Sequence, residues 1–296
     1  MVSIPKQNNF GVDKLVLGTA NFDMFYGLER EKLDKTTVAN LLNLAAENNI
    51  EHLDTANGYG NSEELIGELI PLGLQFKITT KIDPRNCKTV DDVLNVIKES
   101  LVKTHQKRLW SVLIHRPEVL FGNNSAIVKI ALLEALKNNL TENIGVSAYT
   151  LTEVCEAKES LPELKIFQVP ENILDRRIAN SQEIHKLSRS GNLFFVRSIF
   201  LQGLLTSDPD KLPLNLRDAR KVLIELGEIS VKLNLDIMSL CIAYAKSLAW
   251  ANGILVGVNN TVQLREIVNA FSKSYDIDFS EFPRLDPNLV DPRSWS

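Results

Sequence analysis

The sequence predicts an α/β protein with a single (β/α)8 TIM-barrel domain over residues 1–296. Two patterns lead to this prediction. Short apolar segments alternate strictly with segments of helical periodicity, and this pair occurs eight times. Strict alternation implies parallel strands, because each crossover between parallel strands needs a helix. Eight such units in a chain of 296 residues fit a closed barrel better than an open sheet.

The expected elements follow one another along the chain. We expect strands at 14–19, 50–54, 76–81, 109–115, 143–147, 164–169, 193–197 and 253–256. We expect the helices that follow them at 36–48, 62–70, 90–103, 125–138, 152–159, 181–189, 216–233 and 261–271. The first helix places Val38, Leu42 and Ala45 on one face, with Thr36 as its N-cap. A surplus apolar helix at 237–248 should pack on the barrel exterior, and an irregular tail should begin at about residue 272.

The composition excludes several kinds of partner. The net charge of -4 provides no basic field for nucleic acid and no polybasic patch for a membrane surface. No apolar run reaches the roughly 20 residues of a membrane helix, and the polar N-terminus has no signal pattern. Cys87, Cys155 and Cys241 lie far apart and form no metal-ligand spacing. We therefore expect free thiols, no metal site and a cytoplasmic location, while the oligomeric state has no signal in the sequence.

Four polar residues should meet at one end of the barrel. Asp54 ends the second expected strand, and Tyr59 follows it in a glycine-flanked turn. Lys81 ends the third strand and His115 ends the fourth. The carboxyl ends of barrel strands share one mouth, where catalytic residues of this fold are placed. Alone, each has an ordinary structural interpretation, such as a barrel ion pair or a packed histidine, but their joint occurrence indicates a site.

These residue types suit proton donation to a carbonyl oxygen. Free tyrosine has a pKa of about 10, and a lysine ammonium nearby should lower the pKa of Tyr59. Asp54 would keep Lys81 charged, and His115 would orient the substrate carbonyl. Reduction of a C=O group also needs a hydride, which no side chain supplies, so a nicotinamide cofactor is implied.

The stretch Asp54-Thr-Ala-Asn-Gly-Tyr-Gly-Asn-Ser-Glu, followed by Lys81 and His115, resembles the signature of the aldo-keto reductase superfamily over about residues 14–270. The resemblance implies that Asp54, Tyr59, Lys81 and His115 are catalytic. It also implies contacts with the cofactor. Thr19 would lie near the nicotinamide ribose, Ser147 and Gln168 at the carboxamide, Arg197 at the ring, Ser198, Gln202 and Gly203 near the pyrophosphate, and Gly257, Asn259 and Gln263 at the start of the last helix.

The chain departs from the family pattern where the cofactor would bind. Ala148 replaces an asparagine that is frequent beside the carboxamide serine, and Arg197 replaces a tyrosine that stacks on the nicotinamide. A guanidinium can also stack on an aromatic plane. Val258 and Gln263 stand where a basic pair commonly holds the 2′-phosphate, with Arg265 the nearest basic residue. We expect NADP(H) as the cofactor, with NAD(H) accepted to within about tenfold.

The expected function is therefore an NAD(P)H-dependent carbonyl reductase, an oxidoreductase whose partner is a small carbonyl or alcohol substrate. One alternative is a weakly active or non-enzymatic NAD(P)H-binding redox sensor, which the changes at Ala148 and Arg197 would fit. Another is a Schiff-base aldolase with Lys81 as nucleophile. That chemistry needs a lysine of depressed pKa, and Asp54 beside Lys81 argues against it.

Overall fold

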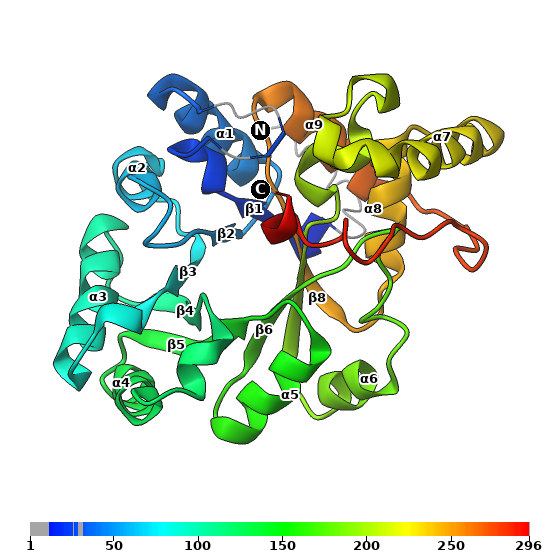
Figure 1. Cartoon of the computed structure of the whole chain (residues 1–296). Coiled ribbons are helices and arrows are strands. Elements are labelled where there is room, and N and C mark those ends of the chain that lie inside the picture. The colour runs from blue at the N-terminus through cyan, green and yellow to red at the C-terminus, as the bar shows by residue number, and fades with distance from the viewer. Residues whose placement is uncertain (1–11, 26, 29–31, 296) are drawn as a thin grey trace.

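The computed structural model describes residues 12–25, 27–28 and 32–295. Eight parallel strands close into a barrel in sequence order, and helices surround them (Figure 1). The strands are β1 (Leu15–Gly18), β2 (His52–Asp54), β3 (Lys77–Ile82), β4 (Leu109–Ile114), β5 (Thr141–Ser147), β6 (Ile166–Pro170), β7 (Leu193–Arg197) and β8 (Ala251–Val256). The α-helices in the described part of the chain are α1 (Lys35–Glu47), α2 (Ser62–Leu69), α3 (Val90–Lys103), α4 (Ser125–Lys137), α5 (Leu151–Ser160), α6 (Gln182–Arg189), α7 (Arg220–Leu233), α8 (Ile237–Ser247) and α9 (Thr261–Ser272).

The predicted barrel is confirmed, and each predicted strand end lies within two residues of the observed one. Parallel pairing of β1 with β8, with Leu15 opposite Ile254, closes the ring. A second apolar cluster, separate from the main core, joins residues of β1, β4, β6, β7 and β8. Side chains from strands spread around the ring can meet only inside the barrel, so the lumen is a packed core below the mouth.

Helix starts follow local capping chemistry. The N-cap of α1 is Asp34 rather than the predicted Thr36, because the Asp34 carboxylate accepts a hydrogen bond of 2.7 Å from the backbone N–H of Thr37. At α3, Thr89 and Asp92 form a reciprocal capping box. The predicted helix 216–233 begins as a 3-10 turn, and its α-helical part is α7.

The helix that is surplus to the eight-fold pattern is α7, and the prediction that it is 237–248 was wrong. The segment 237–248 does pack on the barrel as α8, which contacts β8 and buries every residue from Ser239 to Ala245. In α7 only Leu223 and Leu226 are buried, and the helix lies at the periphery (Figure 1). The helix that is apolar around most of its surface covers the strands, because it has the most area to remove from water.

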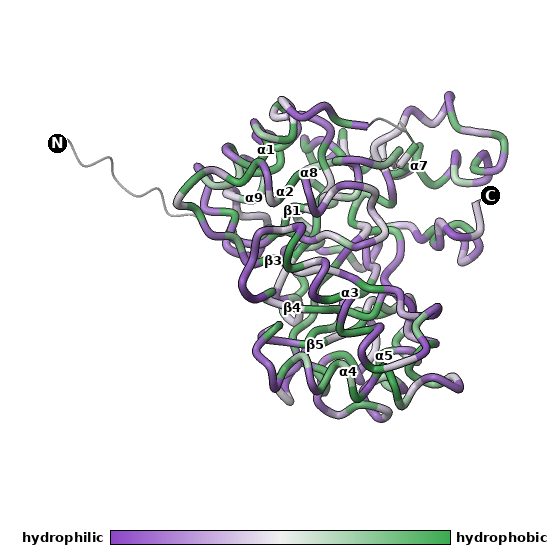
Figure 2. Tube along the Cα trace, turned by 90° about the vertical axis from the view of Figure 1, so that its left-hand side faces the viewer, coloured by the Kyte–Doolittle hydropathy of each residue, from purple (hydrophilic) through white to green (hydrophobic). Residues whose placement is uncertain are grey.

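The chain after α9 returns to the mouth of the barrel. The backbone N–H of Leu285 donates to Leu174 O at 3.0 Å, in the loop after β6. Arg176, in the same loop, donates to the carbonyl oxygens of Phe279 and Phe282, each at 2.7 Å. From the side, the C-terminus and α7 lie at the same end of the molecule (Figure 2). Among the described helices, none is long and apolar enough to cross a membrane.

Candidate active site

A buried ion pair forms the centre of the site. Lys81 Nζ lies 2.5 Å from Asp54 Oδ2 and 3.0 Å from Thr55 O. Both partners are almost fully buried, Lys81 at 2% and Asp54 at 4% exposure. Gln168, from β6, donates to Asp54 Oδ1 at 2.8 Å across the barrel. Both carboxylate oxygens of Asp54 are therefore engaged, which compensates part of the cost of removing two charges from water.

Tyr59 and His115 stand beside this pair. Lys81 Nζ lies 5.3 Å from the centroid of the Tyr59 ring. The ring of His115 meets Tyr59 edge to face, with the ring centroids 5.9 Å apart. The structure therefore brings the four residues named from the sequence to one place at the mouth.

The ionisation of Tyr59 differs from the expectation. Burial, and next the negative charge of Asp54, raise the pKa of Tyr59 above its usual value, while Arg197 opposes them. We expected Lys81 to lower that pKa; instead the loss of water around the phenol is the largest effect. Tyr59 therefore keeps its proton at neutral pH. Burial, and next the positive charges of Lys81 and Arg197, lower the pKa of His115 to about 4, so its imidazole is neutral.

Local bonds explain the glycine-rich turn that carries Tyr59. Gly60 has φ +58, and a Cβ there would lie 2.5 Å from Asp23 Oδ2, which accepts the backbone N–H of Asn61 at 2.7 Å. A side chain at Gly60 would displace this anchor. Ser62 Oγ donates to Thr19 O at 3.0 Å. The end of the signature thus holds the turn against the loop after β1.

A cavity of about 900 Å³ opens next to the mouth, between β8, α8, α9 and the 3-10 segment η5 (Leu201–Thr206). Predicted cofactor residues that line it are Ser198, Gln202, Gly203, Gly257, Asn259 and Gln263. The four residues of the tetrad do not line it. Of the other predicted cofactor residues, Ser147 and Gln168 pair in register at the ends of β5 and β6, Thr19 follows β1, and Arg197 ends β7.

The loop after β7 has an unusual backbone. Ser198, Leu201 and Gln202 have φ values of 63, 47 and 54, and Gly203 has 93. Non-glycine residues in this left-handed region carry strain, which proteins concentrate at ligand-binding sites. Backbone N–H groups in such turns can form a concavity for anions. Here the N–H groups of Leu201 and Gly203 donate to Ser198 O and Phe200 O, at 2.9 and 3.0 Å.

Two buried atoms fit a nicotinamide cofactor. Gln168 Oε1 and Asn21 Oδ1 are buried and have no hydrogen-bond partner among the described residues. Because Gln168 Nε2 is bonded to Asp54, its oxygen is left to accept from another donor, which a carboxamide NH2 would supply. Asn21 lines the cavity and was not singled out from the sequence. The residues present therefore fit the cofactor that the sequence implies.

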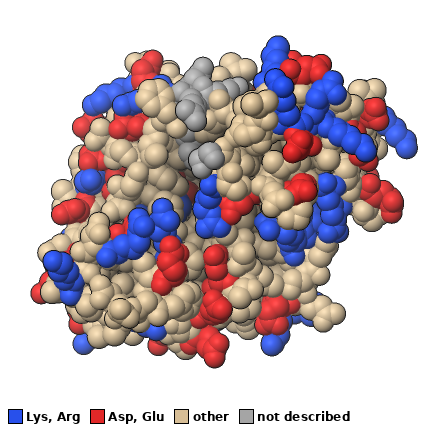
Figure 3. Space-filling view, viewed as in Figure 1, with Lys and Arg blue, Asp and Glu red and all other residues tan. Residues whose placement is uncertain are grey.

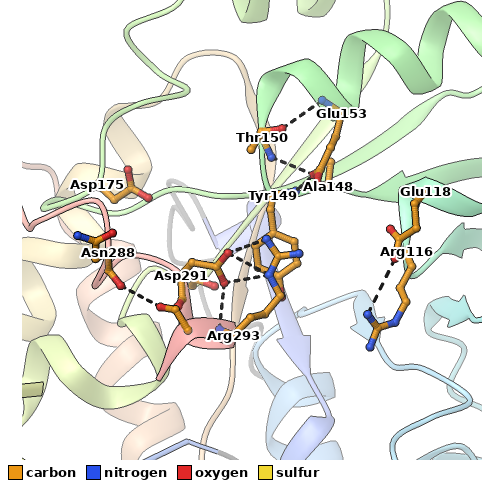
Figure 4. Close-up of polar contacts among 12 residues, drawn as sticks. Arg116, Glu118, Ala148, Tyr149, Thr150, Glu153, Asp175, Asn288, Asp291 and Arg293 are labelled. Carbon is orange, nitrogen blue, oxygen red and sulfur yellow. Dashed lines mark hydrogen bonds and ion pairs between the residues drawn. The ribbon is translucent and has the colours of Figure 1, made fainter. Parts of the chain in front are cut away.

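Arg197 has neighbours that the sequence did not indicate. Its Nη2 donates to Ala148 O at 3.2 Å, and its guanidinium carbon lies 4.1 Å from the centroid of the Tyr149 ring. Arg293, from the 3-10 turn η8 (Pro292–Ser294) of the tail, lies 3.5 Å from the same centroid and pairs with Asp291 (Figure 4). The only sequence signal was an aromatic residue after a strand end and a basic residue in the tail.

The chain therefore forms a barrel with a buried Lys–Asp pair, a tyrosine and a histidine at its mouth, next to a cavity of about 900 Å³. The chain belongs to the Aldo/keto reductase family, whose model matches residues 14–286. This membership implies an NAD(P)-dependent oxidoreductase that acts on small carbonyl compounds.

Solved structures support the fold. A Pseudomonas aeruginosa protein assigned to the aldo-keto reductases matches with a TM-score of 0.63 and 20% identity, over 88% of this chain and 90% of that chain. A thermostable aldo-keto reductase solved with the inhibitor epalrestat matches with a TM-score of 0.69 and 23% identity, over 89% of this chain and 91% of that chain. No curated protein matches the sequence.

Proposed function

We propose that this chain reduces a carbonyl group with NAD(P)H and that Tyr59 donates the proton. The observation that carries the proposal is the contact of Tyr59 with both the Lys81–Asp54 pair and His115. The cofactor, held by the residues of the cavity and by Gln168, would supply the hydride.

Each residue of the tetrad then has one role. His115, neutral at pH 7, donates an N–H to the substrate carbonyl oxygen and orients it toward Tyr59. Tyr59 gives its proton to the oxygen as negative charge develops there, and its phenolate is left beside the Lys81 ammonium. Asp54 holds Lys81 in place. Because its pKa is raised, Tyr59 carries its proton at neutral pH when the carbonyl binds.

The test is Tyr59→Phe, which removes the hydroxyl and keeps the ring. We expect kcat for an aldehyde panel to fall about 10²-fold or more, with little change in cofactor Kd. Tyr275→Phe is the matched control, because Tyr275 lies beyond α9 and donates to Ala270 O. If Tyr59→Phe turns over as fast as this control, Tyr59 is not the proton donor.

The charges around the cavity bear on the choice between NADPH and NADH. Its charged lining residues are Asp236, Glu266 and Lys273, and Arg265 is exposed and does not line it. Gln263 accepts the backbone N–H of Asn259 at 2.7 Å through its side chain. Phosphate groups in proteins usually bind arginine or lysine. The described residues that line the cavity include no arginine that could bind the 2′-phosphate of NADPH.

We therefore expect NADH to bind within about tenfold of NADPH, since one charged hydrogen bond changes affinity by about ten- to a hundredfold. Both cofactors should be titrated by fluorescence at one ionic strength, on the wild type, Lys273→Ala and Arg265→Ala. A preference for NADPH above about a hundredfold would contradict the proposal. If Arg265→Ala abolished such a preference, the phosphate would bind outside the cavity described above.

A redox sensor is the second candidate, and the position of Arg197 favours it. Its guanidinium already stacks on Tyr149 and bonds to Ala148 O. If that contact blocks a productive nicotinamide position, the protein binds cofactor without fast turnover. Micromolar cofactor binding together with no turnover across a broad carbonyl panel would favour the sensor over the reductase.

A further inference from the structure

Arg197 differs from the other described cations around the mouth of the barrel. Ion pairs join many of the charged side chains around it: Lys81 with Asp54, Arg85 and Arg116 with Asp83, Arg116 also with Glu118, Arg177 with Asp175, and Arg293 with Asp291. Arg197 makes no ion pair with any described carboxylate. On the face shown in Figure 3, basic and acidic side chains lie next to one another.

The nearby acids are already engaged. Asp291 binds Arg293 through both of its carboxylate oxygens, at 2.6 to 3.0 Å. Glu153 accepts the backbone N–H groups of Tyr149 and Thr150 at 2.5 and 3.1 Å (Figure 4). Neither carboxylate forms an ion pair with Arg197, although the charge of Arg197 is among the smaller causes that lower the pKa of Asp291.

Arg197 also has hydrogen-bond donors to spare. A guanidinium has five N–H donors. Its Nη2 bonds to Ala148 O at 3.2 Å and its Nη1 to Ser198 Oγ at 3.3 Å, while Nε has no partner among the described residues. The face of the guanidinium lies against Tyr149. Stacking uses the face of a guanidinium and leaves its edge for hydrogen bonds, so this arrangement presents an oriented fork of donors.

Arg197 ends β7 and lies close enough to Tyr59 and His115 for its charge to act on both. At Tyr59 this charge opposes the increase in pKa that burial causes. At His115 it adds to the decrease in pKa that burial causes. A molecule whose carbonyl oxygen lies between those two rings therefore extends into the field of Arg197. An anionic group on that molecule would be attracted by the positive charge of Arg197 and would accept hydrogen bonds from its guanidinium.

We propose that the substrate carries a carboxylate in addition to its carbonyl group, and that Arg197 binds this carboxylate. The proposal rests on the reductase function proposed above and specifies its substrate class as oxo acids or aldehyde acids. The stacked ring of Tyr149 would fix the orientation of the Arg197 guanidinium. Arg293, from the C-terminal tail, also stacks on this ring and would keep Tyr149 in position. In the competing view the substrate is neutral and Arg197 serves only to stack.

A matched pair of substrates separates the two views. We would measure kcat/KM for para-carboxybenzaldehyde and for its methyl ester, which differ in charge but share the aldehyde and the ring. The wild type should prefer the acid by about tenfold or more, because a charged hydrogen bond changes binding by about ten- to a hundredfold. Raising the salt concentration should increase KM for the acid and leave KM for the ester unchanged.

Variants of Arg197 test the assignment of the residue. In Arg197→Met the preference for the acid should fall to about unity, and Arg197→Lys should retain part of it, because lysine keeps the charge without the fork. Any effect on the cofactor is common to both substrates and cancels in the ratio. Arg116→Met is the matched control, because Arg116 already pairs with Asp83 and Glu118, and it should leave the ratio unchanged.

The possible failures are distinct. Equal kcat/KM values for acid and ester in the wild type, or an acid preference that survives Arg197→Met, would overturn the proposal. If Arg197→Met does not fold, Arg197→Lys and the salt dependence of the wild type still decide. Ester reduction that depends on Tyr59 would support the reductase even when the carboxylate proposal fails, whereas no reduction of either substrate would count against both.

Discussion

Asp54 links the proton-donating part of the site to the cofactor part. Its Oδ2 accepts from Lys81 and its Oδ1 accepts from Gln168. The second bond determines which way the Gln168 amide points, because the nitrogen is held by a carboxylate and the oxygen must face another donor. One buried carboxylate thus orients both the ammonium beside Tyr59 and the amide proposed to bind the cofactor.

This dependence predicts the behaviour of Lys81→Met. The substitution leaves the buried Asp54 carboxyl group without its cation, and removal of one partner from a buried pair costs about 3–5 kcal/mol. We expect a loss of that order in the free energy of unfolding, measured with denaturant. We also expect most carbonyl reduction to be lost, because the phenolate of Tyr59 loses its neighbouring positive charge.

The double variant Asp54→Asn/Lys81→Met is the control for this prediction. It removes both charges, so it should be less destabilised than the sum of the two single variants. It should still be inactive, because Tyr59 lacks the ammonium. If Lys81→Met kept the wild-type free energy of unfolding, the pair would not contribute to stability as predicted. If it also kept full activity, Lys81 would have no role in the reaction.

At the scale of the elements, strand ends were the most predictable feature of the sequence. A short apolar strand that stops at a polar residue has one orientation in a barrel, and so Asp54, Lys81 and His115 could be placed at one mouth. The signature turn placed Tyr59 with them. Local pattern sufficed here because each of these positions depends on its own strand and not on distant packing.

The features that the sequence did not reveal depend on contacts distant in sequence. Arg293 meets Tyr149 only because the tail crosses the mouth, and no periodicity in either segment signals that contact. Whether the pKa of Tyr59 is raised or lowered depends on how deeply its turn is buried, and the residue types alone do not determine that burial. For α7 and α8, both segments had helical periodicity, and the difference in their packing, with α8 against β8, was visible only in the structure.

At the scale of the whole molecule, a buried acid connects the barrel to the outer shell. Glu171, just after β6, is 1% exposed. Its Oε1 accepts the hydroxyl of Tyr244 from α8 at 2.5 Å, and its Oε2 accepts the backbone N–H groups of Ile178 and Ala179, each at 3.2 Å. Burial raises the pKa of Glu171 to about 8, although these hydrogen bonds oppose the shift.

The raised pKa of Glu171 gives the stability of the fold a definite dependence on pH. Between its unfolded pKa of 4.5 and its folded pKa of about 8, the folded state binds more protons than the unfolded state. Stability therefore falls as pH rises through this range. His52 and His115 have pKa values lowered to about 4, and their opposite contribution is nearly complete by pH 7. The informative window is consequently pH 7 to about 8.5.

In that window the wild type should lose roughly 1 kcal/mol of unfolding free energy. Glu171→Gln cannot ionise, so its unfolding free energy should change much less over the same range. Glu156→Gln, at an exposed position of α5, should keep the wild-type dependence. Denaturant unfolding at constant ionic strength measures all three proteins. If Glu171→Gln kept the wild-type slope, or if the wild type became more stable toward alkaline pH, Glu171 would be ionised in the folded protein and some other group would control the alkaline limit.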